Sequence, residues 1–184
     1  MTDKNNNTEK NMEIAQKRAR KDILLDYAPY IVIIVVVILL RTFIATPIRV
    51  NGASMDPTIN NGETMVLNKL SMHMRGLRRW DIVVARADDT HLIKRVIALP
   101  GETVKYYDGV LFINGEPVED KFSLTTTYDF TEITVGENEY FLMGDNRAVS
   151  QDSRNPIIGN VSRKDILGKT NIILFPFSRF GMVE

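Results

Sequence analysis

Thr103-Val-Lys-Tyr-Tyr107-Asp-Gly-Val110-Leu-Phe-Ile113-Asn114-Gly115 contains two runs rich in valine, isoleucine and aromatic residues, each followed by a pair of turn residues. Asp-Gly and Asn-Gly are favoured in two-residue hairpin turns, because a type I′ turn needs positive φ angles at both central positions. The stretch therefore predicts two strands, Thr103–Tyr107 and Val110–Ile113, joined by a tight turn. A second hairpin turn is predicted at Asn114-Gly115.

On both sides of this hairpin, the chain beyond Thr46 continues as short strand-like runs separated by turns. They are Pro47–Val50, Thr64–Asn68, Asp81–Ala85, Leu92–Leu99, Glu132–Val135, Glu139–Met143 and Thr170–Phe175. Tyr128–Glu137 can be either a surface loop or an edge hairpin. Strong helical periodicity is confined to the N-terminal part, and no repeat is detectable. We therefore expect a mainly β domain, an antiparallel structure that is coiled and partly barrel-like, with a strand order that the sequence leaves open.

An apolar run precedes this β region. From Tyr27 to Leu40 it has fourteen residues without a charge, which as a helix cover about 21 Å of the roughly 30 Å hydrocarbon core of a bilayer. Extended to residues 23–45, the helix reaches about 35 Å and predicts one transmembrane segment. The alternative, a buried β-strand, is disfavoured because strands are rarely this long.

The basic residues before the apolar run indicate its orientation; they are Lys17, Arg18, Arg20 and Lys21. The positive-inside rule places residues 1–22 in the cytoplasm as a tail and residues 46–184 on the extracytoplasmic face of the cell (plasma) membrane. A cut after Ala45 would put bulky Phe43 at the third position before it, where cleavable signal peptides carry a small residue. We therefore expect an uncleaved, single-pass signal anchor in the lipid bilayer.

Composition narrows the chemistry. Positive and negative residues balance at 23 each, which argues against a nucleic-acid partner. The chain has no cysteine, so thiol nucleophiles, disulfides and cysteine zinc sites are excluded. The only histidines are His73 and His91, too few for an all-histidine zinc site. We expect no metal and no cofactor, and nothing in the sequence indicates the oligomeric state.

Ser54 is a candidate nucleophile, because it stands in Gly52-Ala-Ser-Met-Asp-Pro-Thr58 shortly after the predicted anchor. A serine hydroxyl needs a base, and neither histidine has a motif beside it, which disfavours a serine–histidine triad. Lys94 lies inside the apolar run Leu92–Ile97, where burial would lower its pKa into the range of a base. Each residue also has a structural alternative: Ser54 can cap a turn, and Lys94 can be a surface lysine on an edge strand.

A third polar segment, Gly144-Asp-Asn-Arg-Ala-Val-Ser150-Gln-Asp152-Ser-Arg154, forms a glycine-led loop. It can be a salt-bridged scaffold that involves Asp152 and Arg154. A buried catalytic lysine also needs a polar group that positions its amine, and the Ser150 hydroxyl can form such a hydrogen bond.

Together these segments resemble the bacterial type I signal peptidases, or leader peptidases. The resemblance runs from the anchor to the end of the chain, and it rests on motifs that occur in the order and at the separations found in the family: Gly52–Thr58, Arg79–Val84, Lys94–Gly101 and Gly144–Arg154. It implies a β-rich serine endopeptidase that removes signal peptides from exported preproteins by cutting after small residues, at Ala-x-Ala sites. It also implies a serine–lysine dyad and no cofactor.

By the same resemblance, Ser54 is the nucleophile, Lys94 the general base and Ser150 the residue that orients the lysine. The Ser54 backbone N–H is an oxyanion donor, but Gly52 lacks the hydroxyl that some members place there, which leaves a second donor unassigned. The implied supporting residues are Arg95, Asp145, Asp152 and Arg154, with Arg95 paired to Asp145. The expected lining of the substrate pocket is Ile48, Val50, Met55 and Val84.

The chain departs from the family pattern at a few positions without losing a reacting group. Trp80 and Ala98 stand where glycine is common, Glu102 replaces an aspartate, and Ile59 replaces a leucine.

The sequence leaves two other functions open. A self-cleaving repressor-type peptidase is disfavoured by the short tail and long apolar run. A catalytically silent, membrane-anchored β-domain that binds partners would use the same motifs as scaffold only.

Overall fold

The computed structural model describes residues 26–38, 45–70, 76–87, 90–123 and 125–183. Residues 26–38 form a helix, and the chain from Phe43 onward is a separate compact unit. Within the described residues, no helix has both the length and the apolar character needed to cross a bilayer. Of the predicted anchor, residues 23–25 and 39–44 lie outside the described residues, as does the whole predicted tail, 1–22.

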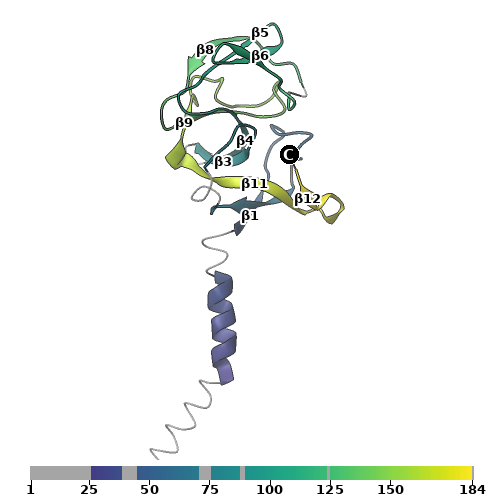
Figure 1. Ribbon diagram of the computed structural model, residues 1–184. Coiled ribbons are helices and arrows are strands. Elements are labelled where there is room, and N and C mark those ends of the chain that lie inside the picture. Colours follow the sequence, from purple (N-terminus) through teal and green to yellow (C-terminus); the bar gives the residue numbers. More distant parts are fainter. Residues whose placement is uncertain (1–25, 39–44, 71–75, 88–89, 124, 184) are drawn as a thin grey trace, which may run out of the picture. The chain divides into compact units, whose positions relative to one another are not determined.

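The β domain consists of two antiparallel sheets (Figure 1). The larger follows the order β1-β2-β11-β3-β4-β9-β10, with β12 beside β11, and the smaller follows β7-β6-β5-β8. The strands of the larger sheet are β1 (Ala45–Arg49), β2 (Thr64–Asn68), β3 (Ile82–Ala87), β4 (Thr90–Ala98), β9 (Glu139–Met143), β10 (Val161–Ser162), β11 (Ile166–Phe175) and β12 (Gly181–Met182). Those of the smaller sheet are β5 (Thr103–Tyr107), β6 (Val110–Ile113), β7 (Glu116–Val118) and β8 (Phe130–Thr134). Two short 3-10 helices are η1 (Arg163–Asp165) and η2 (Phe177–Arg179).

The predicted mainly β, antiparallel architecture is confirmed. The order of the larger sheet runs from β1 to β10 without returning to its start, so the described strands form open sheets and no closed barrel. Tyr128–Glu137, left open between loop and edge hairpin, contains β8 at the edge of the smaller sheet.

The hairpin prediction is also confirmed. Strands β5 and β6 have the predicted bounds and pair with Tyr107 opposite Val110. Asp108 has a φ of 48° and Gly109 a φ of 76°, the two positive angles that a type I′ turn requires. The very short strands β7, β10 and β12 were not predicted, because so few residues produce no recognisable pattern.

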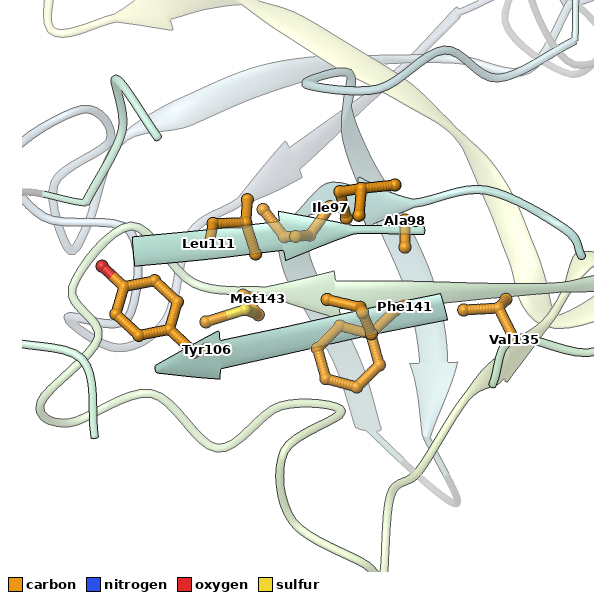
Figure 2. Close-up of a cluster of buried hydrophobic side chains, with 9 residues drawn as sticks. Ile97, Ala98, Tyr106, Leu111, Val135, Phe141 and Met143 are labelled. Carbon is orange, nitrogen blue, oxygen red and sulfur yellow. The ribbon is translucent and has the colours of Figure 1, made fainter. Parts of the chain in front are cut away.

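A buried apolar cluster joins the two sheets (Figure 2). It combines the ends of β4 and β9 in the larger sheet with β5 and β6 in the smaller one. Its members are Ile97, Ala98, Val104, Tyr106, Leu111, Ile113, Val135, Phe141 and Met143. A second cluster lies at the segment that contains Ser54 and comprises Val50, Met55, Ile59, Met65, Ile82 and Ile173. Burial of these side chains fixes β4 and the Ser54 segment, the two elements that build the site described below.

A fully buried ion pair connects β4 to the loop after β9. The guanidinium of Arg95 donates from Nε to Asp145 Oδ1 at 2.8 Å and from Nη2 to Asp145 Oδ2 at 2.7 Å. Its third nitrogen, Nη1, donates to the Trp80 carbonyl at 2.8 Å, and its Cζ lies 3.5 Å from the centre of the Phe122 ring. Two parallel charge-assisted bonds restrict both distance and orientation, so the pair locks the loop onto the strand.

Trp80 stands in a backbone conformation that side chains rarely adopt, with a φ of 75°. Glycine would reach this positive φ without strain, so the backbone at Trp80 is strained. The Trp80 ring packs on the cluster between the sheets and on Phe122, with centroids 5.6 Å apart. These contacts offset the backbone strain.

Replacing Asp145 by asparagine should destabilise the domain. Arg95 would keep its charge in a buried site without an anionic partner, which costs about 3 kcal/mol in the free energy of unfolding. Thermal unfolding of the full-length chain in detergent micelles, followed by near-UV circular dichroism, measures the change. The matched control is Glu119→Gln, which breaks a 4.0 Å pair with Lys121 whose side chains are 80% and 68% exposed. A similar small shift for both variants would contradict a structural role for the buried pair.

Candidate active site

Ser54 lies in the turn between β1 and β2, and neighbouring side chains hold this turn in place. Met55 and Ile59 are almost fully buried, and the Ile59 N–H donates to the Met55 carbonyl at 3.0 Å. The Thr58 hydroxyl donates to Asp145 Oδ2 at 2.7 Å, so the Arg95–Asp145 pair also anchors this turn. With the turn held by these apolar and polar contacts, Ser54 is half-buried.

Lys94 on β4 contacts Ser54 directly. Its Nζ donates to Ser54 Oγ at 2.7 Å and to the Ile93 carbonyl at 3.2 Å. Lys94 is only 3% exposed, so it is not the exposed edge-strand lysine that the sequence left as an alternative. Neighbouring side chains of a strand point to opposite faces. Arg95 therefore faces its buried partner while Lys94 faces the serine.

The surroundings of Lys94 lower its pKa from 10.5 to about 8. Burial has the largest effect, because the ammonium form loses its hydration. Among nearby charges, Asp152 and Asp145 raise the pKa and Arg154 lowers it. A lysine with a pKa near 8 is about one-tenth neutral at pH 7, and its neutral form can accept a proton from the bound hydroxyl.

The loop that begins at Gly144 contains a second ion pair beside the lysine. Arg154 donates to both oxygens of Asp152 at 2.8 Å, and the Gly144 N–H donates to Asp152 Oδ2 at 3.1 Å. Burial alone would raise the pKa of Asp152, but these bonds and the Arg154 charge outweigh it, and the pKa is lowered. The carboxylate therefore stays ionised near Lys94.

Ser150 lies in this group, but its hydroxyl forms no hydrogen bond with Lys94. Its hydroxyl is buried near the Asp152 carboxylate, but within the described part of the chain it meets no partner with hydrogen-bond geometry. The hydroxyl packs against Gly144, where an added Cβ would lie 2.3 Å from Ser150 Oγ and from the Ser54 carbonyl oxygen. A role for Ser150 in orienting Lys94 stays a prediction.

Arg147 and Asp120 form a third buried pair, which sequence reasoning missed. Arg147 binds both carboxylate oxygens of Asp120, and its Nε donates to the Gly144 carbonyl at 2.9 Å. The pair links the loop to the segment after β7. Arg147 stands in a recognised motif, whereas nothing in the local sequence around Asp120 marks it as a partner.

A cleft of about 870 Å³ contains both Ser54 and Lys94. All four residues expected in the pocket, Ile48, Val50, Met55 and Val84, line it. The remaining lining residues come mainly from the Ser54 turn, β1 and the first half of β4: Thr46, Arg49, Asn51, Gly52, Leu67, Lys69, Thr90, His91, Leu92, Ile93 and Leu167. His91 lines the same cleft, but the hydrogen-bond partner of Ser54 Oγ is Lys94. His73 lies outside the described residues.

Position 52 offers no ready oxyanion donor. Gly52 has no side chain, and its N–H donates to Asn61 Oδ1 at 2.9 Å. By contrast, the Ser54 N–H has no acceptor among the described residues. Those residues also contain no group of three or more histidine, aspartate or glutamate side chains placed to bind a metal ion.

In this open β domain, a serine is hydrogen-bonded to a buried lysine of lowered pKa, and both residues line one cleft. These features place the protein in the class of serine peptidases. The family described as signal peptidase, peptidase S26, matches residues 24–175 of this sequence. The chain therefore belongs to the S26 family of signal peptidases.

Individual relatives match along most of the chain. Signal peptidase I of Bacillus amyloliquefaciens is 36% identical over 175 residues, which cover 89% of this chain and 94% of the relative. Signal peptidase I S of Bacillus subtilis (strain 168) is 38% identical, with coverages of 87% and 94%. Signal peptidase I T of the same strain is 37% identical, with coverages of 99% and 98%. A crystal structure of a signal peptidase I from Enterococcus faecalis V583, 32% identical, covers 52% of this chain and 97% of that chain with a TM-score of 0.47.

Gly144→Ala should lower the rate of peptide hydrolysis. The added methyl would overlap the Ser54 carbonyl, which is backbone, and push the Ser54 turn away from Lys94. A misplacement of about 1 Å at a reacting group costs about 100-fold in rate, so a loss of tenfold or more in kcat/KM is expected. Gly136→Ala is the matched control, because the three atoms nearest to its methyl all belong to the flexible Glu139 side chain. Equal rates for the two variants would show that the close approach at Gly144 is not needed.

Proposed function

We propose that this chain is a membrane-anchored serine endopeptidase that removes signal peptides from exported preproteins with a Ser54–Lys94 dyad. The observation that carries the proposal is the 2.7 Å hydrogen bond between Lys94 Nζ and Ser54 Oγ, made inside a largely apolar cleft. The substrate class is supported by the relatives, which are signal peptidases.

In the first half of the reaction, Ser54 Oγ attacks the scissile carbonyl carbon while its proton passes to neutral Lys94 Nζ. The negative charge that develops on the carbonyl oxygen is stabilised by preorganised donors, of which the Ser54 N–H is one. The C–N bond then breaks, and protonated Lys94 gives its proton to the leaving amine. The product is an ester between the signal peptide and Ser54.

In the second half, a water molecule replaces the leaving amine. Lys94, neutral again, takes a proton from this water as its oxygen attacks the ester carbonyl. The bond to Ser54 Oγ breaks, the serine recovers its proton from Lys94, and the signal peptide leaves as a carboxylic acid, which releases its remaining proton to solvent. The proton transfers do not involve the side chains of Asp145, Asp152, Arg95 and Arg154. These residues instead hold Ser54 and Lys94 in position and influence the pKa of Lys94.

We propose that the substrate lies extended along the cleft with small residues at the first and third positions before the cut. Within the described strands, β9 pairs with β4 only from Arg95 onward, so the part of β4 that lines the cleft pairs with β3 alone. An extended peptide can add itself to such a strand. Ile48, Val50, Met55 and Val84 offer apolar walls that accept an alanine side chain and exclude large ones by overlap.

We propose that residues 23–45 anchor the enzyme in the plasma membrane, with 1–22 in the cytoplasm and 46–184 on the outer face. Support comes from the basic residues ahead of the apolar run and from residues 31–38 of the helix, whose side chains are about half exposed. Confining the enzyme and its membrane-inserted substrates to one surface raises their effective concentration.

Ser54→Ala and Lys94→Met should each abolish cleavage of a preprotein that carries an Ala-x-Ala site. Ser54→Ala removes the attacking oxygen and Lys94→Met its base, and losing either member of such a unit costs several orders of magnitude in kcat. The assay uses the full-length chain in detergent micelles and follows the mature product by gel. Matched controls are Ser162→Ala and Lys164→Met, which lie on β10 and η1 away from the cleft. Wild-type rates in either dyad variant would disprove the dyad, and an inactive wild type would favour a silent binding domain.

Thermal unfolding distinguishes loss of the base from misfolding. Because the pKa of Lys94 is lower in the folded than in the unfolded chain, the folded state loses stability as the pH falls from about 10.5 to about 8 and does not regain it below. The cost at neutral pH is on the order of 3 kcal/mol. Lys94→Met removes this cost, so the inactive variant should unfold at a higher temperature than the wild type.

The pH profile should report the lysine. Below about pH 8, kcat/KM should rise about tenfold per pH unit as Lys94 loses its proton, and it should level off above that pH. Initial rates at substrate concentrations well below KM, measured from pH 6 to 10, test this. Activity that stays constant from pH 8 down to pH 6 would rule out a lysine base.

A further inference from the structure

We infer that Asn146 is a positioning residue that orients the Ser54 peptide group, so that its N–H faces the developing oxyanion. The inference rests on the proposed function, because it assigns Asn146 a role in cleavage by Ser54. It starts from two hydrogen bonds made by this one residue. The Asn146 N–H donates to the Ser54 carbonyl at 3.1 Å, and Asn146 Nδ2 donates to the Ala53 carbonyl at 3.1 Å.

These two carbonyls belong to the peptide groups on either side of the Ser54 Cα. Fixing both planes fixes the backbone angles of Ser54 itself, since φ and ψ are the only soft torsions between them. The serine side chain leaves the same Cα, so the direction in which Oγ approaches the substrate is fixed as well. Lys94, which lines the cleft, binds Oγ, and Asn146, which is not among the cleft residues, binds the backbone of the Ser54 turn.

The bond to Ala53 also decides where the oxyanion donor points. The Ala53 carbonyl and the Ser54 N–H are the two ends of one planar trans peptide, and they point in opposite directions. With the carbonyl held by Asn146, the N–H is directed away from it, and no described residue accepts its hydrogen bond. A donor to the carbonyl further polarises the peptide group and strengthens the N–H as a donor. Because Gly52 supplies no hydroxyl as a second donor, stabilisation of the oxyanion depends more strongly on the orientation of the Ser54 N–H.

Asparagine suits this position chemically. Its side chain has the amide donor that a carbonyl requires, and aspartate has the same shape but only acceptor oxygens when ionised. The neighbouring Asp145 is locked onto Arg95, which places the Asn146 backbone. The Asp56 N–H also donates to the Ala53 carbonyl, at 3.2 Å, so the turn stays tethered without the asparagine side chain. Loss of Asn146 Nδ2 should therefore affect the rate more than folding.

The test is Asn146→Ala in the full-length chain in detergent micelles, assayed with the Ala-x-Ala preprotein on the high-pH plateau. Removing one oxyanion donor costs about 100- to 1,000-fold in kcat, and misorienting one should cost less, so we expect kcat to fall about 10- to 100-fold. KM should stay within about threefold of wild type, because the lost interaction is made in the transition state. The midpoint of the pH profile should not move, because the contact between Lys94 and Ser54 Oγ remains.

Asn160→Ala is the matched control. Its Nδ2 also donates to a backbone carbonyl, that of Thr134 at 2.9 Å, but the bond lies outside the cleft. Wild-type kcat is expected for this variant. Asn146→Asp keeps the size of the side chain while removing the donor, and it should lose at least as much kcat as the alanine variant even if Asn146→Ala folds poorly.

Three results would overturn the inference. The first is a kcat of Asn146→Asp within about twofold of wild type, and the second is a loss of kcat in Asn160→Ala equal to that in Asn146→Ala. The third is a shifted midpoint of the pH profile in Asn146→Ala, which would place the effect on Lys94. The Ser54→Ala variant distinguishes failure of the proposed function from failure of the role assigned to Asn146. If Ser54→Ala still cleaves, the proposed function fails and the inference with it. If Ser54→Ala is inactive while the Asn146 variants keep wild-type kcat, only the role of Asn146 is disproved.

Discussion

The buried pair between Arg95 and Asp145 is the constraint on which the site depends. Arg95 and Lys94 are consecutive on β4, so their side chains leave opposite faces of the strand. Locking Arg95 onto Asp145 with two hydrogen bonds therefore sets the position from which Lys94 projects into the cleft. The same Asp145 accepts a hydrogen bond from Thr58, four residues after the serine. The Asp145 carboxylate therefore holds both the strand that carries Lys94 and the turn that carries Ser54.

The electrostatics of the site follow from how its carboxylates are partnered. An unpaired aspartate beside Lys94 would favour the ammonium form and keep its pKa high. Here Asp145 is bound to Arg95 and Asp152 to Arg154, so each negative charge near the lysine is accompanied by a positive one. The effect of burial then prevails, and the lysine reaches a pKa of about 8. The lowered pKa is therefore a property of the whole group of charged residues, not of Lys94 alone.

The parts of the fold that could be predicted from the sequence are those with a local signal. The turn pairs Asp108-Gly109 and Asn114-Gly115 specify positive φ by themselves, so the first hairpin was predicted with correct bounds. Strands β10 and β12 have two residues each and depend on a neighbouring strand, which no local pattern reveals.

The candidate site was predictable to a different degree at each position. Ser54 and Lys94 are 40 residues apart. Until the joint pattern of motifs was considered, the structural explanation was as good as the functional one for Lys94 and better for Ser54. The pair of Arg147 and Asp120, 27 residues apart, carries no such pattern on the aspartate side and was missed. Asn146 was visible within a motif, but its role depends on which carbonyls the fold brings to it. Long-range pairing is set by the sheet order, and the sequence did not determine that order.

The arrangement places most of the positioning in one loop, and this has a physical reason. Asp145, Asn146 and Arg147 are consecutive, yet they bind three different partners: β4, the Ser54 turn and the segment that contains Asp120. Strand residues alternate between only two faces, whereas a loop can direct three neighbours to three elements. Such a loop must pass very close to the serine, and Gly144 at its start permits this, because the Ser54 carbonyl and the Ser150 hydroxyl occupy the space of a side chain. The accuracy of the site thus depends on a tight approach between two loops, which the buried ion pairs make rigid.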